Sequence, residues 1–240
     1  MYETETLKTE KKTKIPENLL VVERYKRSQR IHHWIHVILM VFFLFTGFEL
    51  FIKMYFVGDY HTTRTLHLIF SAFIGFWDLI IFPAIVIKFK KYGEIIPTPR
   101  DFLDMFIIFL CAIRILPDSK YPHYDYYNVD EKKYVMKYHP AQKVLSLTNL
   151  FAILAMGVTG VVLSEQINPG YVPSIIVDIF NLILLPLDWF AIDIRLVHFF
   201  VFLYFLMTTM VHFYFAIIPQ NRERLRGMVT GKEKIPLKEK

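Results

Sequence analysis

Four long apolar stretches dominate the pattern of hydrophobic and polar positions along the chain. Each contains about 20 or more mostly apolar residues, the length that a helix needs to cross a lipid bilayer. They cover residues 33–56, 64–88, 142–163 and 195–218. The pattern therefore predicts an all-α membrane protein, a four-transmembrane-helix bundle whose membrane domain spans residues 33–218.

Two further apolar stretches are too short to cross a bilayer. Residues 101–116 are interrupted by Asp104 and Arg114, and residues 174–185 contain Asp178. We expect the first to form a helix at the membrane interface or under the bundle, and the second to form a helix on the outer surface. A fifth span over the second stretch is the alternative.

The distribution of positive charge predicts the orientation of the bundle. With four spans, 25 of the 28 lysine and arginine residues fall on one side of the membrane. Because positively charged loops stay on the cytoplasmic side, we expect a cytoplasmic basic arm over residues 1–32 and a cytoplasmic basic tail over residues 219–240. Both termini would then be cytoplasmic, whereas a fifth span would place the basic tail outside. The formal charge of +6 therefore reflects basic residues on the predicted cytoplasmic side of the membrane, and it does not indicate nucleic-acid binding.

The amino-acid composition limits which cofactors the chain could hold. The chain is 54% hydrophobic and 17% aromatic, which is more apolar than a typical soluble domain. Its single cysteine, Cys111, excludes a CxxCH haem attachment, an intrachain disulfide and a cysteine-ligated iron–sulfur cluster held by this chain alone. Residues 1–18 are polar and charged, so we expect no secretory signal peptide there.

Two histidines lie in the last apolar stretch. His198 and His212 are 14 positions apart, which on a helix places them roughly 21 Å apart along the axis and within roughly 40° of the same face. Ionisable side chains inside a membrane span are costly and usually functional. This spacing suggests a helix that ligates two stacked haems.

Two more histidines lie at matching depths in the first two stretches. His33 opens the first span at the cytoplasmic side, and His67 lies about one turn inside the second span at the outer side. Depth therefore pairs His33 with His212 and His67 with His198, as two b-type haems with two histidine ligands each would require. Any one of these histidines could instead be a hydrogen-bonded membrane residue, but four at matched depths favour haem ligation.

Glycines occur at the depth of the outer pair. Gly47 follows His33 by 14 positions, and Gly157 and Gly160 lie in the second half of the third span. Glycine lets a flat group or a neighbouring backbone approach a helix closely. These glycines are compatible with a porphyrin edge, although ordinary helix packing in membranes uses them as well.

Several motifs, together with the His198/His212 pair, resemble those of one known family. They are RIHHW at Arg30–Trp34, LH at Leu66–His67, KYHPAQK at Lys137–Lys143 and RLRGMVTGK at Arg224–Lys232. In order and spacing, over residues 24–232, they resemble the gamma subunit of respiratory membrane-bound formate dehydrogenase. More distantly, the chain is similar to the cytochrome b subunit of nickel–iron hydrogenases.

The resemblance implies two haem b groups. It assigns His33 and His212 to the iron of the cytoplasmic-side haem and His67 and His198 to that of the outer-side haem, the same pairing that depth gives. It further implies a subunit without a substrate-oxidising site, in the cytoplasmic membrane of a bacterium or archaeon. Such a subunit passes electrons from an iron–sulfur subunit outside to menaquinone or ubiquinone near the cytoplasmic haem. The implied catalytic partner is a molybdenum- or tungsten-pterin formate dehydrogenase.

The resemblance also points to a quinone site. In the family a KYNxGQK-like segment before the third span helps to form that pocket, and here His139 stands in the Asn position and Ala141 in the Gly position. We expect His139 and Gln142 to contact a quinone carbonyl; the alternative is that both only cap the start of a helix. Asp78, on the cytoplasmic half of the second span, could relay protons to reduced quinone, or could be a partnered polar residue of the bundle. His36, one turn after His33, could reach the same pocket.

Two alternative functions remain open from the sequence. The insert at residues 173–193 is longer than the corresponding loop of the formate dehydrogenase subunit, which leaves room for another partner. The first alternative is therefore the cytochrome b subunit of a nickel–iron hydrogenase or of another periplasmic oxidoreductase. The second is a haem-free transporter or scaffold, against which stand the matched histidine depths and the lack of a repeat between the two halves.

Overall fold

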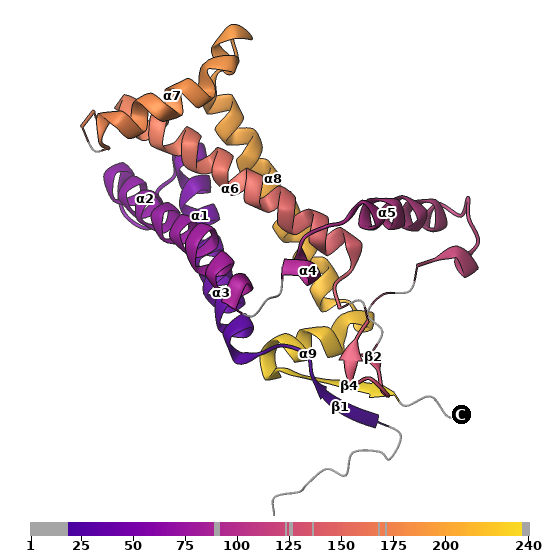
Figure 1. Ribbon diagram of the computed structural model, residues 1–240. Coiled ribbons are helices and arrows are strands. Elements are labelled where there is room, and N and C mark those ends of the chain that lie inside the picture. Colours follow the sequence, from indigo (N-terminus) through magenta and orange to yellow (C-terminus); the bar gives the residue numbers. More distant parts are fainter. Residues whose placement is uncertain are drawn as a thin grey trace, which may run out of the picture.

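Four helices long and apolar enough to cross a membrane dominate the computed structural model (Figure 1). The structure describes residues 19–88, 92–122, 124, 127–135, 137–167, 169–170 and 172–236. The four helices are α1 (Arg27–Ile52); α2 (Tyr60–Phe76), which continues through a π-helical turn (Trp77–Ile81) into α3 (Phe82–Lys88); α6 (Pro140–Ile167); and α8 (Ile194–Ile217). The prediction of a four-helix membrane bundle is confirmed.

The bounds of the first two spans differ from the prediction because polar residues cap the helices. The first span starts at Arg27 rather than at residue 33, since the Gln29 side-chain oxygen accepts a hydrogen bond of 3.0 Å from the Lys26 amide before the apolar run begins. The second starts at Tyr60 rather than at residue 64, because the Asp59 carboxylate accepts a hydrogen bond of 2.7 Å from the Thr62 amide. Near the end of α1, the fully buried Glu49 carboxylate accepts hydrogen bonds from the amides of Phe56 and Val57 in the loop that follows.

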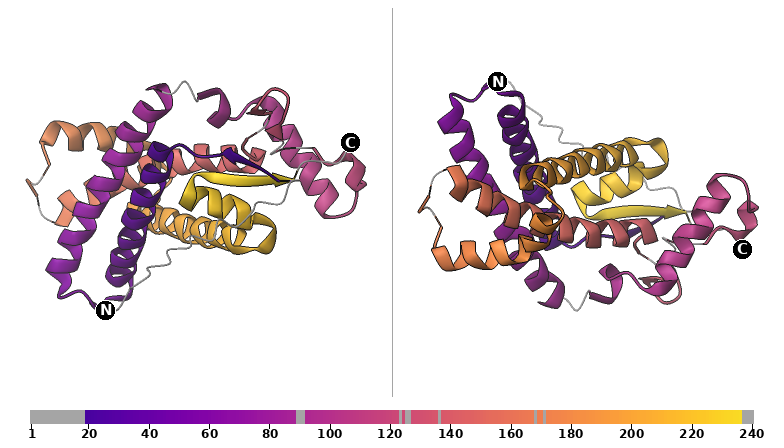
Figure 2. Two further views of the ribbon diagram at one scale, coloured as in Figure 1. Left: turned by 90° about the horizontal axis from the view of Figure 1, so that it is seen from below. Right: turned by 90° about the horizontal axis from the view of Figure 1, so that it is seen from above.

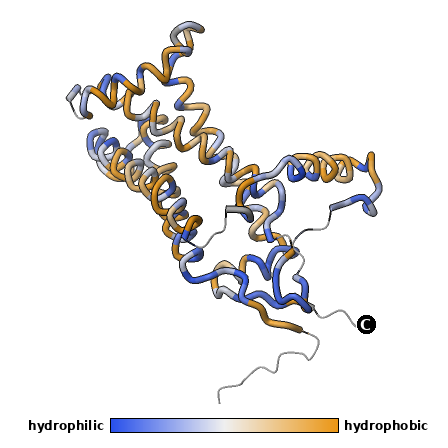
Figure 3. The backbone as a smooth tube through the Cα atoms, viewed as in Figure 1, coloured by the Kyte–Doolittle hydropathy of each residue, from blue (hydrophilic) through white to orange (hydrophobic). Residues whose placement is uncertain are grey.

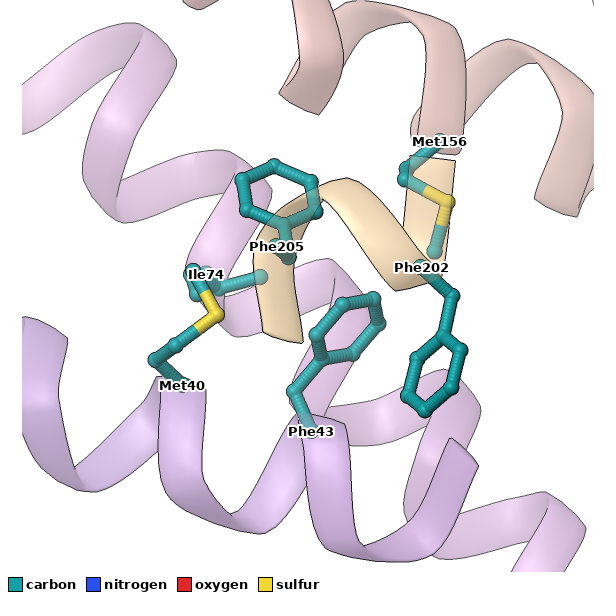
Figure 4. Packing of buried hydrophobic residues seen from close by; sticks show 6 residues of the cluster. All are labelled: Met40, Phe43, Ile74, Met156, Phe202 and Phe205. Carbon is teal, nitrogen blue, oxygen red and sulfur yellow. The ribbon is translucent and has the colours of Figure 1, made fainter. Parts of the chain in front are cut away.

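The helices form two pairs, α1 with α2 and α6 with α8, and fewer contacts join one pair to the other (Figures 1 and 2). Six buried side chains make the core where the pairs meet (Figure 4). They are Met40, Phe43, Ile74, Met156, Phe202 and Phe205. Many other large apolar side chains of these helices are exposed, and Figure 3 shows hydrophobic residues along much of their length, as expected for surfaces that face lipid rather than water.

Two short helices, α7 (Ser174–Trp189) and α5 (Pro99–Ala112), flank the bundle at opposite ends (Figure 1). A single turn, α4 (Tyr92–Ile95), precedes α5, which projects away from the bundle. The 16 residues of α7 and the 14 of α5 extend only about 24 and 21 Å, less than a bilayer needs. Both helices expose large apolar side chains, which is compatible with the predicted surface location.

One buried ion pair fixes α5 to the start of α6. The Lys143 ammonium lies 2.9 Å from the Asp101 carboxylate, which also accepts hydrogen bonds from the amide and hydroxyl of Thr98. Burial alone would raise the pKa of Asp101, but the hydrogen bonds from Thr98 and Lys143 outweigh it, so the pKa is lowered. The contact therefore stabilises the fold above the ordinary aspartate pKa of about 3.9 and is lost as the pH falls below it.

We expect Asp101→Asn to lower the free energy of unfolding by about 3 kcal/mol at pH 7, because it leaves the buried Lys143 ammonium without its counter-ion. The difference from the unmodified chain should persist at pH 4 and shrink only at lower pH, as the pH falls through the lowered pKa of Asp101. Thermal unfolding in detergent at pH 7, at pH 4 and below pH 4 measures both effects. The exposed Asp118→Asn is the matched control, and an equal loss in both variants would contradict the assignment.

The ends of the described chain meet in a two-stranded antiparallel sheet. Strand β1 (Leu19–Glu23) pairs with β4 (Lys232–Pro236), and α9 (Arg222–Thr230) leads into β4 (Figures 1 and 2). The turn between α9 and β4 needs Gly231, whose φ is 86°. We call β1, α9 and β4 the terminal clasp. Parts of the predicted basic arm (residues 1–32) and basic tail (residues 219–240) thus pack against each other, and their cytoplasmic location stays a prediction. Residues 1–18 and 237–240 lie outside the described part.

Arg24 holds the terminal clasp together. Its side chain is buried, and its guanidinium pairs with the Glu233 carboxylate at 2.7 Å and donates to the Lys137 carbonyl at 3.2 Å. Tyr134 donates a second hydrogen bond of 2.7 Å to Glu233. Tyr134 belongs to a small hairpin of β2 (Tyr127–Asn128) and β3 (Lys133–Tyr134). The hairpin before α6 is therefore fixed to the same end of the bundle as the clasp.

Candidate functional site

The inner pair, His33 on α1 and His212 on α8, lies at the clasp end of the bundle. Their ring centroids are 6.2 Å apart and their planes are inclined by 62°. Metal–imidazole bonds of about 2.0–2.1 Å place two rings on opposite sides of one metal with centroids about 6 Å apart. The separation of these two rings therefore fits a single metal ion between them, as in a haem with two histidine ligands.

The terminal clasp positions the inner pair. The Arg30 guanidinium donates to the Val229 carbonyl at 2.6 Å, and the Trp34 indole N–H donates to the Met228 carbonyl at 3.3 Å. Both carbonyls belong to the last turns of α9, where backbone acceptors lack helical partners. Because α9 follows α8, these bonds hold the first turns of α1 beside the end of the helix that carries His212.

The outer pair, His67 on α2 and His198 on α8, lies nearer the α7 end, and each ring is held by a threonine of another helix. The Thr46 hydroxyl of α1 lies 3.1 Å from His67 Nδ1, and the Thr159 hydroxyl of α6 lies 2.8 Å from His198 Nδ1. Sequence analysis missed these threonines, although each precedes a glycine that it singled out.

The threonine contacts favour one tautomer of each outer ring. The Thr46 hydroxyl donates to the Phe42 carbonyl at 2.8 Å, and the Thr159 hydroxyl donates to the Ala155 carbonyl at 2.7 Å. A hydroxyl has one proton, so a hydroxyl that donates to its carbonyl accepts from the histidine, and this arrangement favours the tautomer with hydrogen on Nδ1. Nε2 of both rings then keeps its lone pair, which is the state of a metal-ligating histidine.

Two of the three glycines lie against the outer rings. A Cβ atom added to Gly47 would come within 3.1 Å of His67 Cε1, and one added to Gly160 would come within 3.4 Å of His198 Cε1. A Cβ on Gly157 would meet no described atom within 4 Å. Gly47 and Gly160 thus allow α1 and α6 to approach the imidazoles, whereas Gly157 has no such contact.

The hydrophobic core separates the two histidine pairs. Phe205 lies seven residues from both His198 and His212, and Met40 lies seven residues after His33, which is about 10 Å along a helix. Both side chains belong to the buried cluster (Figure 4). The pairs therefore lie at two levels of the bundle with packed apolar side chains between them.

Further polar groups surround the inner pair. Among the neighbouring histidines, His32 stacks on Trp77 and Phe82 at 5.6 and 4.8 Å, so His33 is the one that meets His212. His36 Nδ1 lies 2.9 Å from one carboxylate oxygen of Asp78, whose other oxygen is buried and without a hydrogen-bond partner in the described part of the chain. Asp78 belongs to the π-helical turn, a feature frequent at functional sites.

His139 and Gln142 lie at the start of α6. The Ala141 amide donates to His139 Nδ1 at 3.0 Å, and the His139 amide donates to the Gln142 side-chain oxygen at 3.2 Å. The His139 ring also packs against Tyr124 with the centroids 4.5 Å apart. Both side chains therefore cap the helix, as the alternative interpretation expected, and their contact with a quinone stays a prediction.

Comparison with known proteins points to a redox function. The chain is 28% identical over 152 residues to the F420 non-reducing hydrogenase II cytochrome subunit of Methanosarcina mazei, and the match covers 60% of this chain and 55% of that protein. The chain thus spans about half the length of this relative. The match favours the hydrogenase alternative over the formate dehydrogenase interpretation. Residues 24–231 match the family model described as prokaryotic cytochrome b561, and the chain therefore belongs to that family.

Proposed function

We propose that this chain is the membrane cytochrome b subunit of a hydrogenase-type oxidoreductase. It would carry electrons through two haem b groups from an iron–sulfur subunit outside to a quinone near the cytoplasmic side. The observation that carries this proposal is the arrangement of two histidine pairs at two levels along α8, with the inner rings 6.2 Å apart. Family membership independently implies haem b.

Each part of the chain has a defined task in this proposal. His33 and His212 would hold the inner haem, and His67 and His198 the outer haem. Haem supplies the one-electron redox chemistry, while the protein provides ligation, position and an apolar environment. The buried cluster around Phe205 would exclude water between the two levels. The chain would be an electron-transfer subunit without a substrate-oxidising site of its own.

The proposed orientation places the terminal clasp in the cytoplasm and α7 outside. The excess of lysine and arginine at the clasp end supports this, since such residues are retained on the cytoplasmic side. The iron–sulfur partner would then approach from the α7 end, close to the outer pair. A formate dehydrogenase partner would deliver electrons at the same end of the bundle. The metal of the co-purified catalytic subunit distinguishes the two partners, since a hydrogenase would contain nickel and a formate dehydrogenase a pterin-bound metal.

The electron acceptor would bind near the inner pair. Quinone reduction needs protons as well as electrons. The part-buried His36–Asp78 pair lies on α1 and on the π-helical turn next to α2, at the same end as His33. This supports menaquinone or ubiquinone as the acceptor. His139 and Gln142 at the start of α6 are the second candidate contact.

Haem content tests the proposed ligation. We expect the purified chain to bind two b-type haems and each of the four alanine variants of His33, His67, His198 and His212 to bind about one, because a haem with one ligand removed is held much less tightly. Oxidised-minus-reduced optical spectra with haem quantified per chain provide the measurement. His61→Ala, at an exposed position, is the control and should keep both haems. A well-folded chain without haem would overturn the proposed function.

A further inference from the structure

Two matched threonine–glycine pairs enclose the outer histidines. Thr46–Gly47 lies on α1 and Thr159–Gly160 lies on α6, helices that carry neither outer ligand. In each pair the hydroxyl meets Nδ1 of the ring, and the glycine faces Cε1 of the same ring. Two separate helices thus present the same contact to His67 and His198.

Burial makes these hydrogen bonds strong and persistent. Thr46 and Thr159 are each 1% exposed, so water does not compete for the histidine N–H. Each hydroxyl gives its own proton to a carbonyl one turn earlier in its helix, and it is therefore available to the imidazole only as an acceptor. The contact can form with one tautomer of each ring and disfavours the other.

A hydrogen bond from Nδ1–H changes the ligand chemistry of the opposite nitrogen. It draws the proton away from the ring and makes Nε2 a more basic ligand. A more basic histidine ligand would favour the oxidised state of a bound haem iron and lower its reduction potential, since hydrogen bonding around the ligands is one of the means by which proteins set that potential. Both ligands of the outer haem would receive this effect.

Among the residues that the structure describes, the inner pair lacks this contact, because no described side chain hydrogen-bonds a ring nitrogen of His33 or His212. The His33 ring instead packs edge-on against Trp34, with the ring centroids 5.6 Å apart. The inner pair therefore provides an internal reference for the effect of the threonines.

We propose that Thr46 and Thr159 hold the outer histidines in the Nδ1-protonated tautomer and thereby set the outer haem to a lower reduction potential than the inner haem. The two threonines are positioning residues that act through His67 and His198, and the proposal rests on the haem ligation given above. Electrons that enter at the outer haem would then pass to the inner haem downhill in energy.

Threonine-to-valine variants test this proposal, because valine keeps the shape of threonine and removes the acceptor. In Thr46→Val and Thr159→Val, the midpoint potential of the outer haem should rise, and it should rise further in the double variant, while that of the inner haem stays constant. Thr46→Ser and Thr159→Ser keep the hydroxyl, so the midpoint potential of the outer haem should equal that of the unmodified chain. Redox titration of the haem absorbance measures both potentials. The same substitutions in the His212→Ala background, which should lack the inner haem, identify the potential that belongs to the outer haem.

The outcomes separate this proposal from the proposed function. If the chain binds two haems and the valine variants leave the outer potential unchanged, or shift both potentials equally, the threonine proposal is wrong while the haem ligation stands. If valine prevents the outer haem from binding, Thr46→Cys and Thr159→Cys provide the same test, since a thiol is a weak acceptor and should raise the outer potential by less. An unchanged potential in the cysteine variants would equally overturn the proposal.

Discussion

Loss of the outer haem should interrupt electron flow before the inner haem, whereas loss of the inner haem should leave the outer haem reducible. We expect His198→Ala to lower the rate of inner-haem reduction by the outside partner to nearly that of a chain without haem. The physical reason is distance, because the two levels lie roughly 20 Å apart along α8 with the buried core between them. His212→Ala should keep fast reduction of the outer haem and abolish quinone reduction.

Stopped-flow absorbance of the intact complex in vesicles, driven by the substrate of the catalytic partner, measures this difference. Dithionite, which reduces haem from solution, gives the total reducible haem in each variant. His61→Ala should behave as the unmodified chain. Fast reduction of the inner haem in His198→Ala would contradict the proposed order of the two haems.

Removal of Arg24 should produce the largest loss of stability. We expect Arg24→Ala to cost about 3–5 kcal/mol, because it breaks a buried ion pair with Glu233 and the bond to the Lys137 carbonyl. The clasp would open, and Arg30 and Trp34 would lose the α9 carbonyls that position α1. Thermal unfolding in detergent measures the stability.

The matched control lies in the same clasp. Arg226 pairs with Glu223 at 3.4 Å, but both side chains are more than two-fifths exposed, so Arg226→Ala should cost about 1 kcal/mol or less. In Arg24→Ala the inner haem should also be lost more readily than the outer haem on heating. Equal stability of the two variants, or earlier loss of the outer haem, would show that the clasp does not hold the inner pair in place.

The spans were predictable from the sequence, and the clasp was not. Long apolar runs determine where helices cross a bilayer, whatever the tertiary contacts. Strand β4, by contrast, reads KEKIP and has no alternating apolar face, which is the usual signal of a strand. It forms because Gly231 turns the chain back and because Arg24 and Glu233 pair across distant segments. Such pairing has no local signature.

The depths of the histidines were also predictable, because helical spacing alone determines them. The structure adds the close approach of His33 to His212; haem ligation by the four histidines stays a prediction. The roles of the threonines were not predictable, because a threonine in a membrane helix commonly donates a hydrogen bond to a carbonyl one turn earlier. Thr46 and Thr159 do this as well. Only the three-dimensional contact shows that the same hydroxyls reach histidines on other helices.

The pairing of the helices has a consequence for how the protein matures. Each proposed haem would join α8 to a helix of the other pair, His33 on α1 or His67 on α2, across a boundary where direct packing is limited to the small core. A group that binds only the assembled form stabilises it by mass action. Newly inserted chains would therefore persist as loosely associated halves until haem arrives, and the supply of haem would govern how many escape degradation.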